Sequence, residues 1–158
     1  MDILGVNLTN VRTSTEGPEF RVGTVVDVET SVGTKTYRYI KYDNGAAVDC
    51  VAGNFGYVFA SGGVSAGDMT TLTMDLSESA GVGGGAFQAV IADLGYGWVQ
   101  IGGYATLTTA LTAGADGNAM TPVGSTDGTL DVSAAVTDHI CAIAIDASAK
   151  IVLLTGMR

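Results

Sequence analysis

The chain has 158 residues, of which 47% are apolar and only 15% charged, well below the roughly 25% of charged residues in typical soluble domains. Its length favours one domain around a single core, and its 23 glycines, which follow no three-residue period, exclude a collagen-like protein. The 7 Lys and Arg against 16 Asp and Glu give a net charge of -9, which repels phosphate backbones and argues against nucleic acid as a direct partner.

Sequence features also bear on the compartment in which the chain folds. The longest apolar runs, such as residues 141–145 and 151–154, are far shorter than the ~20 residues that cross a bilayer, so we expect no membrane segment. The opening sequence MDILGVNLTN has neither a basic start nor a long apolar stretch, so we expect no secretory signal and folding in a reducing cytoplasm. Cys50 and Cys141 each lie in an apolar run, which favours buried free thiols over the alternative of a disulfide between them.

Residues 1–19 show no sustained helical or strand periodicity. They are rich in Asn, Thr and Ser, which compete for backbone hydrogen bonds, and Gly17-Pro18 separates them from the first predicted strand. We therefore predict an extended N-terminal arm over residues 1–19 and a single β domain over residues 20–158. The arm is expected to be mobile in the free protein and to become ordered on a partner, for example by adding to a sheet edge. Its apolar residues are the candidate anchors: Ile3, Leu4, Val6 and Leu8.

Two alternating segments follow the arm, at residues 20–30 and 34–42, and both are rich in β-branched and aromatic residues. In the second, the odd-numbered residues 37–41 lie on one face of the predicted strand and the even-numbered residues 38–42 on the other. Asp43-Asn44-Gly45 then predicts a hairpin turn, because Asn-Gly readily takes the positive φ angles of a type I′ turn.

The remaining apolar segments predict seven more strands, at residues 46–51, 55–60, 69–76, 86–92, 96–107, 139–145 and 150–154. Only residues 77–81 and 131–137 could form short helices, and the glycines at 83–85 would form a flexible turn after the first. The spacing of the strands predicts an all-β fold, a mainly antiparallel β-barrel or sandwich that carries the N-terminal arm.

No residue pattern assembles a catalytic, cofactor or metal site. His139 is the only histidine and no Gly-x-Ser-x-Gly occurs, so a hydrolase built around His139 is the weakest alternative and a structural or surface histidine is favoured. Residues 81–85 lack the Lys and Ser/Thr of a phosphate loop. The Asp-Gly pairs at 116–117 and 127–128 lack the spacing of a calcium loop and suit turns. We therefore expect neither enzyme activity nor a cofactor.

The aromatic cluster at residues 96–100 is the most distinctive local feature. Tyr96, Trp98 and Gln100 lie on one face of the predicted strand. Core packing is the favoured interpretation, but aromatic residues are also enriched at binding hot spots, so Tyr96 and Trp98 are candidate partner-binding residues as well. If they were exposed, they and Tyr104 would form a stacking platform for sugar rings; buried aromatics would argue against that platform.

Four segments taken together resemble the small capsid decoration, or cement, proteins of tailed bacteriophages. These segments are TKTYRYIKY at 34–42, the AGD turn at 66–68, YGWVQIGGYATL at 96–107 and CAIAIDASAKIVLL at 141–154. The turn Gly117-Asn118-Ala119-Met120 fits the same pattern. The resemblance covers about residues 20–154, and its pieces are short and rich in Gly, Ala and Val.

The resemblance implies a β-barrel or sandwich subunit that forms a homotrimer on the outside of an icosahedral capsid and braces the shell. Its partners would be the major capsid protein and further copies of itself, and its place would be the exterior of the virion after synthesis in the host cytoplasm. No catalytic residue transfers with the resemblance. The alternative function is a phage tail or fibre recognition module that binds host glycans.

Overall fold

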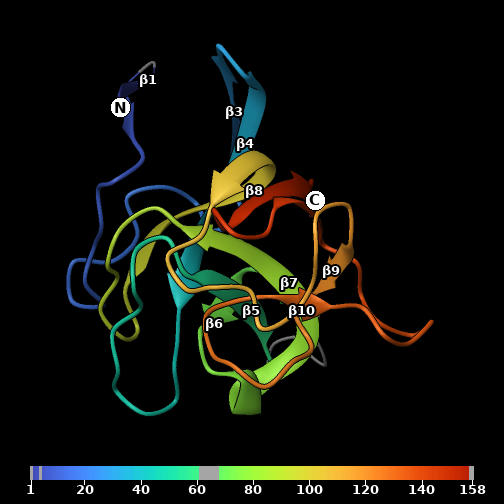
Figure 1. Ribbon diagram of the computed structural model, residues 1–158. Coiled ribbons are helices and arrows are strands. Elements are labelled where there is room, and N and C mark those ends of the chain that lie inside the picture. Colours follow the sequence, from blue (N-terminus) through green and yellow to red (C-terminus); the bar gives the residue numbers. More distant parts are fainter. Residues whose placement is uncertain (1, 4, 61–67, 157–158) are drawn as a thin grey trace.

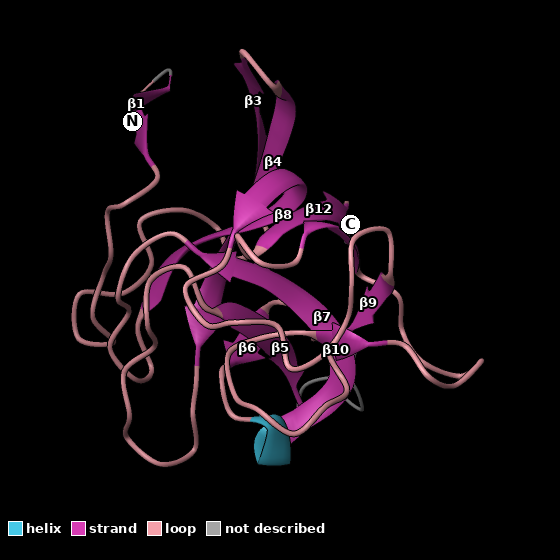
Figure 2. Ribbon diagram, in the orientation of Figure 1, coloured by secondary structure: helices cyan, strands magenta, loops and turns pink. Residues whose placement is uncertain are grey.

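The computed structural model describes residues 2, 3, 5–60 and 68–156 (Figure 1). Strands and loops make up nearly all of these residues, and the helical part of them is a single 3-10 turn, η2 at Leu76–Glu78 (Figure 2). The predicted all-β fold is therefore confirmed. None of the described helical segments has the length and apolar character needed to cross a membrane.

The strands fall into a short N-terminal hairpin and one ten-stranded sheet. Their bounds are β1 Asp2–Ile3, β2 Val6–Asn7, β3 Val25–Thr30, β4 Gly33–Tyr42, β5 Phe55–Phe59, β6 Thr71–Thr73, β7 Ser79–Phe87, β8 Tyr96–Thr106, β9 Ala119–Thr121, β10 Asp131–Val132, β11 Ala142–Asp146 and β12 Ile151–Thr155.

Five strands of the large sheet close on themselves. Along the order β8-β7-β5-β6-β4 each strand is hydrogen-bonded to the next, and β4 pairs again with β8, so these strands form a barrel. All of these pairings are antiparallel except that of β4 with β6. One buried cluster includes Ile40, Tyr42, Leu72, Phe87 and Ile101, which come from four of the five strands. We call these five strands the closed barrel.

The same sheet continues past the barrel as an open extension. The C-terminal half of β8 pairs with β12 from Gly102 to Thr106, and β11, β9 and β10 follow in that order. A second buried cluster lies under these strands and includes Ala105, Met120, Ala142 and Leu154. We call the C-terminal half of β8 with β12, β11, β9 and β10 the open sheet. On the other side of β8, β3 and the start of β4 form a hairpin that projects beyond the barrel (Figure 1).

Part of the N-terminal segment packs on the domain, which corrects the predicted arm for residues 6–12. Leu8 is buried in a third cluster with Val28, Tyr37, Tyr39 and Trp98, and Val6 packs against that cluster. Arg12 and Tyr96 exchange two backbone hydrogen bonds of 2.9 and 2.8 Å. Only β1 and β2 form a separate small hairpin that pairs with no other described strand. Residues 6–12 are therefore part of the fold of the β domain.

Several predicted elements differ from the structure. Residues 46–51 form a loop, because Asn44 is buried, accepts a hydrogen bond from the Tyr42 hydroxyl and donates its N–H to Asp93 instead of closing a hairpin. The glycines at 83–85 lie inside β7 rather than in a turn. At Gly84 the strand has no room for a side chain, because a Cβ there would lie 2.5 Å from the Leu72 side chain across the barrel. Residues 131–137 form β10 and a turn rather than a helix. Both cysteines are buried free thiols, as predicted.

Candidate assembly surface

Three strands of the open sheet carry apolar side chains on both faces. Along the C-terminal half of β8, β11 and β12, buried residues alternate with residues that are exposed or half-buried. The buried set belongs to the second core cluster. The opposite set, which we call the outer face, consists of Tyr104, Thr106, Ile143, Ile145, Ile151, Leu153 and Thr155. The outer face is therefore apolar except for two threonines.

Strand register brings the outer face together as one surface. Leu153 is directly opposite Tyr104 on one side and Ile143 on the other, and Ile151 is opposite Thr106. Directly opposed residues of neighbouring strands have their Cβ atoms about 4.5–5.5 Å apart, so their side chains are in contact range. Tyr104, Leu153 and Ile143, which are far apart in the sequence, thus form one continuous apolar row across the three strands.

The exposure of these side chains is unusual for a sheet that faces water. Tyr104, Ile143 and Ile145 keep 40%, 37% and 39% of their surface exposed. An antiparallel sheet with one face in water normally alternates apolar and polar residues, whereas strands buried on both faces form continuous apolar runs. The runs AIAI at 142–145 and IVLL at 151–154 follow the second pattern. The sequence of the open sheet therefore fits strands that are covered on both faces.

A hollow of about 580 Å³ lies at the edge of the outer face. Its lining residues are Val32, Lys35, Tyr104, Thr106, Ile145 and Ile151. Lys35 is the only charged residue among them, and Val32, in the turn of the β3–β4 hairpin, is 60% exposed. The nearby Asp146 accepts hydrogen bonds from Ala149 N–H and the Ser148 hydroxyl, which lower the pKa of its carboxyl and tie its charge to the β11–β12 turn. The hollow thus combines an apolar lining with one cation.

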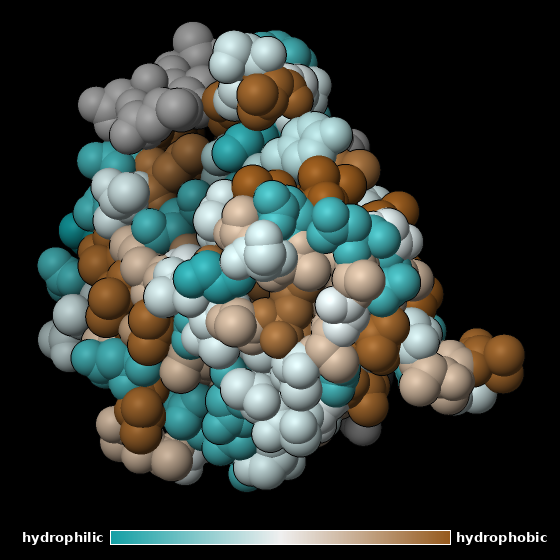
Figure 3. Space-filling model, viewed as in Figure 1, coloured by the Kyte–Doolittle hydropathy of each residue, from teal (hydrophilic) through white to brown (hydrophobic). Residues whose placement is uncertain are grey.

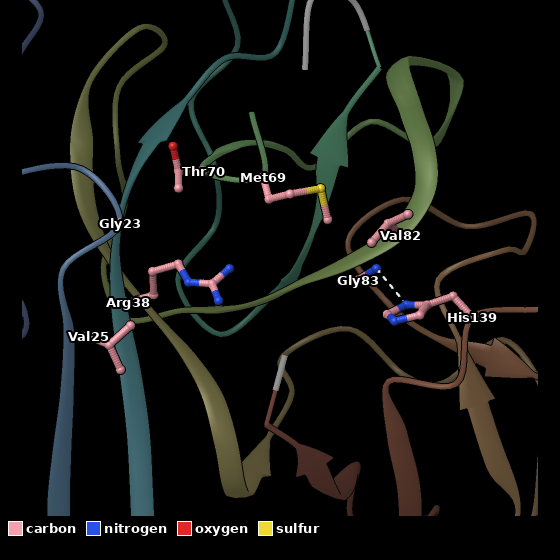
Figure 4. Close-up of a pocket in the computed structure, with 8 residues that line it drawn as sticks. All are labelled: Gly23, Val25, Arg38, Met69, Thr70, Val82, Gly83 and His139. Atoms are coloured by element: carbon pink, nitrogen blue, oxygen red, sulfur yellow. Dashed lines mark hydrogen bonds between the residues drawn. The ribbon is translucent and has the colours of Figure 1, made fainter. Parts of the chain in front are cut away.

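A second hollow, of about 510 Å³, contains the single histidine (Figure 4). Arg38 and His139 reach into it from opposite sides, and apolar side chains such as Val82 and Met69 lie between them. The Nδ1 atom of His139 accepts the Gly83 N–H at 3.1 Å, which ties the loop of residues 133–141 to β7. Burial lowers the pKa of Arg38. This geometry gives His139 a structural contact, and no cluster of three or more metal-ligating side chains occurs among the residues that can be described.

The aromatic residues predicted as binding candidates lie elsewhere. Trp98 is 1% exposed and its ring lies 5.1 Å from that of Tyr39 and 5.4 Å from that of Phe20. Tyr96 is half-buried against the same cluster, whereas Tyr104 is exposed on the outer face. Trp98 therefore belongs to the core, and the three aromatics do not form one sugar-stacking platform.

The predicted anchors of the arm separate in the same way. Leu8 is buried and Val6 is partly buried in the cluster around Trp98. Ile3 lies in β1, where it is paired with Val6, and Leu4 lies outside the described residues, as do Ala66 and Gly67 of the AGD turn. Val6 and Leu8 thus already have partners within their own chain.

Sequence reasoning names no candidate site on the strands predicted at 139–145 and 150–154, although the apolar runs at 141–145 and 151–154 carry a signal for one. Their lack of polar alternation is the feature that indicates burial on both faces. In Figure 3, by comparison, apolar residues are mixed with polar ones over the side of the molecule that is shown. Comparison of the chain with protein-family models, curated proteins and solved structures found no match.

Proposed function

We propose that this protein is a structural virion component that binds the outside of an icosahedral phage capsid as an oligomer and stabilises the shell. Its partners in this proposal are the major capsid protein and other copies of itself. The motif resemblance of residues 20–154 suggests the role, and one structural observation supports it: the continuous apolar outer face of the open sheet. A capsid-bound oligomer requires such a surface, because it must exclude water from protein contacts on more than one side.

The charge distribution is compatible with the same role. The chain has a net charge of -9, yet the seven residues of the outer face carry no charge. Covering the outer face would remove apolar surface from water without the cost of burying an unpaired carboxylate. The acidic residues would remain on surfaces that stay in water.

The proposal is tested by adding purified protein to phage capsids that lack a decoration protein. We expect the protein to sediment with capsids at saturable stoichiometry and to raise the temperature at which the capsids rupture. A protein that stays in the supernatant at saturating concentration, with capsids from several tailed phages, would contradict the proposal. Bovine serum albumin at the same concentration is the control for nonspecific trapping.

The glycan-recognition alternative has less support. It required an exposed aromatic platform, and Trp98 lies in the core instead. Tyr104 alone is exposed among the three aromatics, and it adjoins isoleucines and a leucine rather than the polar groups that fix sugar hydroxyls. A glycan array probed with the purified protein would revive this alternative if it gave a saturable signal that Tyr104→Ala abolished.

A further inference from the structure

We propose that the outer face binds a second copy of this chain, with the tip of the β3–β4 hairpin of one copy in the hollow of the next. The inference deepens the oligomeric part of the proposed function and rests on it only in that part. Its elements are the exposed tip, the hollow beside it, and the distribution of charge around both.

The shape of the surface supplies the first argument. The β3–β4 hairpin projects beyond the barrel, and Val32 at its turn is 60% exposed (Figure 1). The hollow of about 580 Å³ adjoins this hairpin and is lined by Val32 itself and, across from it, by Tyr104, Ile145 and Ile151. When two copies associate symmetrically, the hairpin tip of each copy can enter the hollow of the other. Such a contact is closed, because it leaves no unfilled hollow and no free tip.

The turn itself is well suited to insertion. The two residues between the paired positions Thr30 and Gly33 are Ser31 and Val32. The Thr30 hydroxyl donates to the Gly33 carbonyl at 2.6 Å and accepts the Val32 N–H at 3.3 Å, so the backbone of the tip is held by its own hydrogen bonds. A tip that is already ordered loses little conformational entropy when it enters a hollow.

Charge favours another copy over a partner of unrelated composition. The carboxylate closest to the tip on β3 is Glu29, which is exposed, while the charged residue that lines the hollow is Lys35. Neither residue has an ion pair among the described residues. Entry of the tip into the hollow of a second copy brings these opposite charges to the rim and keeps the uncharged outer faces at the centre. The remaining surfaces of two chains of net charge -9 repel each other, which restricts association to this face.

The test uses two single variants and one matched control. Ser31→Glu alters the tip at an exposed residue that does not line the hollow, and Tyr104→Glu alters the hollow, whereas Val136→Glu places the same charge on a fully exposed residue of the loop 133–141. Mass is measured by sedimentation equilibrium over a range of concentrations. We expect the wild type and Val136→Glu to form a closed oligomer, and each of the other two variants to raise its dissociation constant about tenfold or more.

Mixing the two variants gives the sharper result. The tip variant retains an intact hollow and the hollow variant retains an intact tip, so an equimolar mixture restores one good contact and should associate more tightly than either variant alone. Recovery in the mixture supports the insertion of the tip. Equal weakness of the mixture and of the single variants overturns it, as does a monomeric wild type at about 50 μM, since stable interfaces of standard size hold at that concentration.

Thermal unfolding of each variant checks that the fold is intact. If Tyr104→Glu unfolds, Thr106→Glu introduces the same charge at another exposed position of the hollow and replaces it. Capsid sedimentation separates this inference from the proposed function. A wild type that binds capsids but stays monomeric in solution and is unaffected by Ser31→Glu overturns the inference alone. A wild type that forms the predicted oligomer but never binds capsids overturns the proposed function alone.

Discussion

The closed barrel and the open sheet share the strand β8 but treat their apolar residues differently. In the barrel, β4 returns to β8, so the side chains of all five strands meet in a common interior. In the open sheet, β12 and β11 continue from β8 without closing, and only one of their two apolar faces reaches a core cluster. Closure lets the barrel complete its own core. The outer face of the open sheet, by contrast, is covered by no other described element of the chain.

This difference separates residues that stabilise the chain from residues that are available for association. An apolar residue inside the barrel contributes to folding at any protein concentration. An apolar residue on the outer face gains burial only when a partner covers it, so its contribution depends on concentration. Substitutions in the two regions should therefore differ in the change in stability that they cause.

The largest effect is expected from Phe87→Ala in the barrel. Phe87 is 1% exposed, and its ring lies edge-on to Tyr42 at a centroid distance of 5.5 Å. Removing a buried phenyl group leaves a cavity and should lower the free energy of unfolding by about 3–5 kcal/mol, measured by urea titration. Tyr104→Ala on the outer face is the control and should change it by at most about 0.5 kcal/mol in dilute protein. A similar loss for both variants would remove the distinction between the two regions.

The next effect concerns the N-terminal segment, which covers the outside of the barrel. Leu8 is 4% exposed and lies in the cluster that contains Tyr39 and Trp98. We expect Leu8→Ala to lower the free energy of unfolding by about 2–3 kcal/mol. Val11→Ala is the matched control, because Val11 keeps 36% of its surface exposed. If Leu8→Ala were as mild as Val11→Ala, residues 6–12 would be an arm that folds independently of the domain.

A smaller effect is expected where β8 passes from the barrel into the open sheet. Gly103 has φ +83°, and a Cβ there would lie 2.5 Å from the Thr34 carbonyl oxygen. Gly117 has a similar φ of +86° with nothing within 4 Å of the same position. Both alanine variants incur the left-handed backbone strain of about 1–2 kcal/mol, and Gly103→Ala should lose at least about 1 kcal/mol more from the backbone clash. Equal losses in thermal melts would mean that the two strands can move apart freely.

Much of this fold follows from local sequence signals, and the exceptions have physical causes. The strands at 34–42, 96–107 and 150–154 were predictable because β-branched and aromatic residues alternate or cluster there. The glycines at 83–85 predict a turn from the sequence alone, whereas their role in β7 depends on Leu72, which is remote in the sequence and close in the barrel. The parallel pairing of β4 with β6 is a long-range contact of the same kind.

The candidate surface was harder to predict than the fold. Trp98 was a candidate because aromatic residues serve both cores and interfaces, and its burial depends on Phe20 and Tyr39 from other segments. The outer face depends on the register of β8, β12 and β11, which places Tyr104, Leu153 and Ile143 side by side. The sequence contains the apolar runs but not the information on which of their two faces the rest of the chain covers.

The smallest change is expected from the two thiols, which report on the two regions without altering stability. Cys50 belongs to the barrel cluster and Cys141 to the cluster under the open sheet, and burial raises the pKa of each thiol to about 12. Because the thiolate is the reactive form, both should resist alkylation in the native protein at about pH 8. In low urea we expect Cys141 to react before Cys50, since the open sheet lacks the closure that holds the barrel together. Mass spectrometry of the alkylated peptides gives each rate, with Cys50→Ser and Cys141→Ser variants to assign the signals.

If the outer face is covered by a second copy, raising the protein concentration should slow the reaction of Cys141 and leave that of Cys50 unchanged. Simultaneous reaction of both thiols at every urea and protein concentration would show that the barrel and the open sheet unfold as one unit.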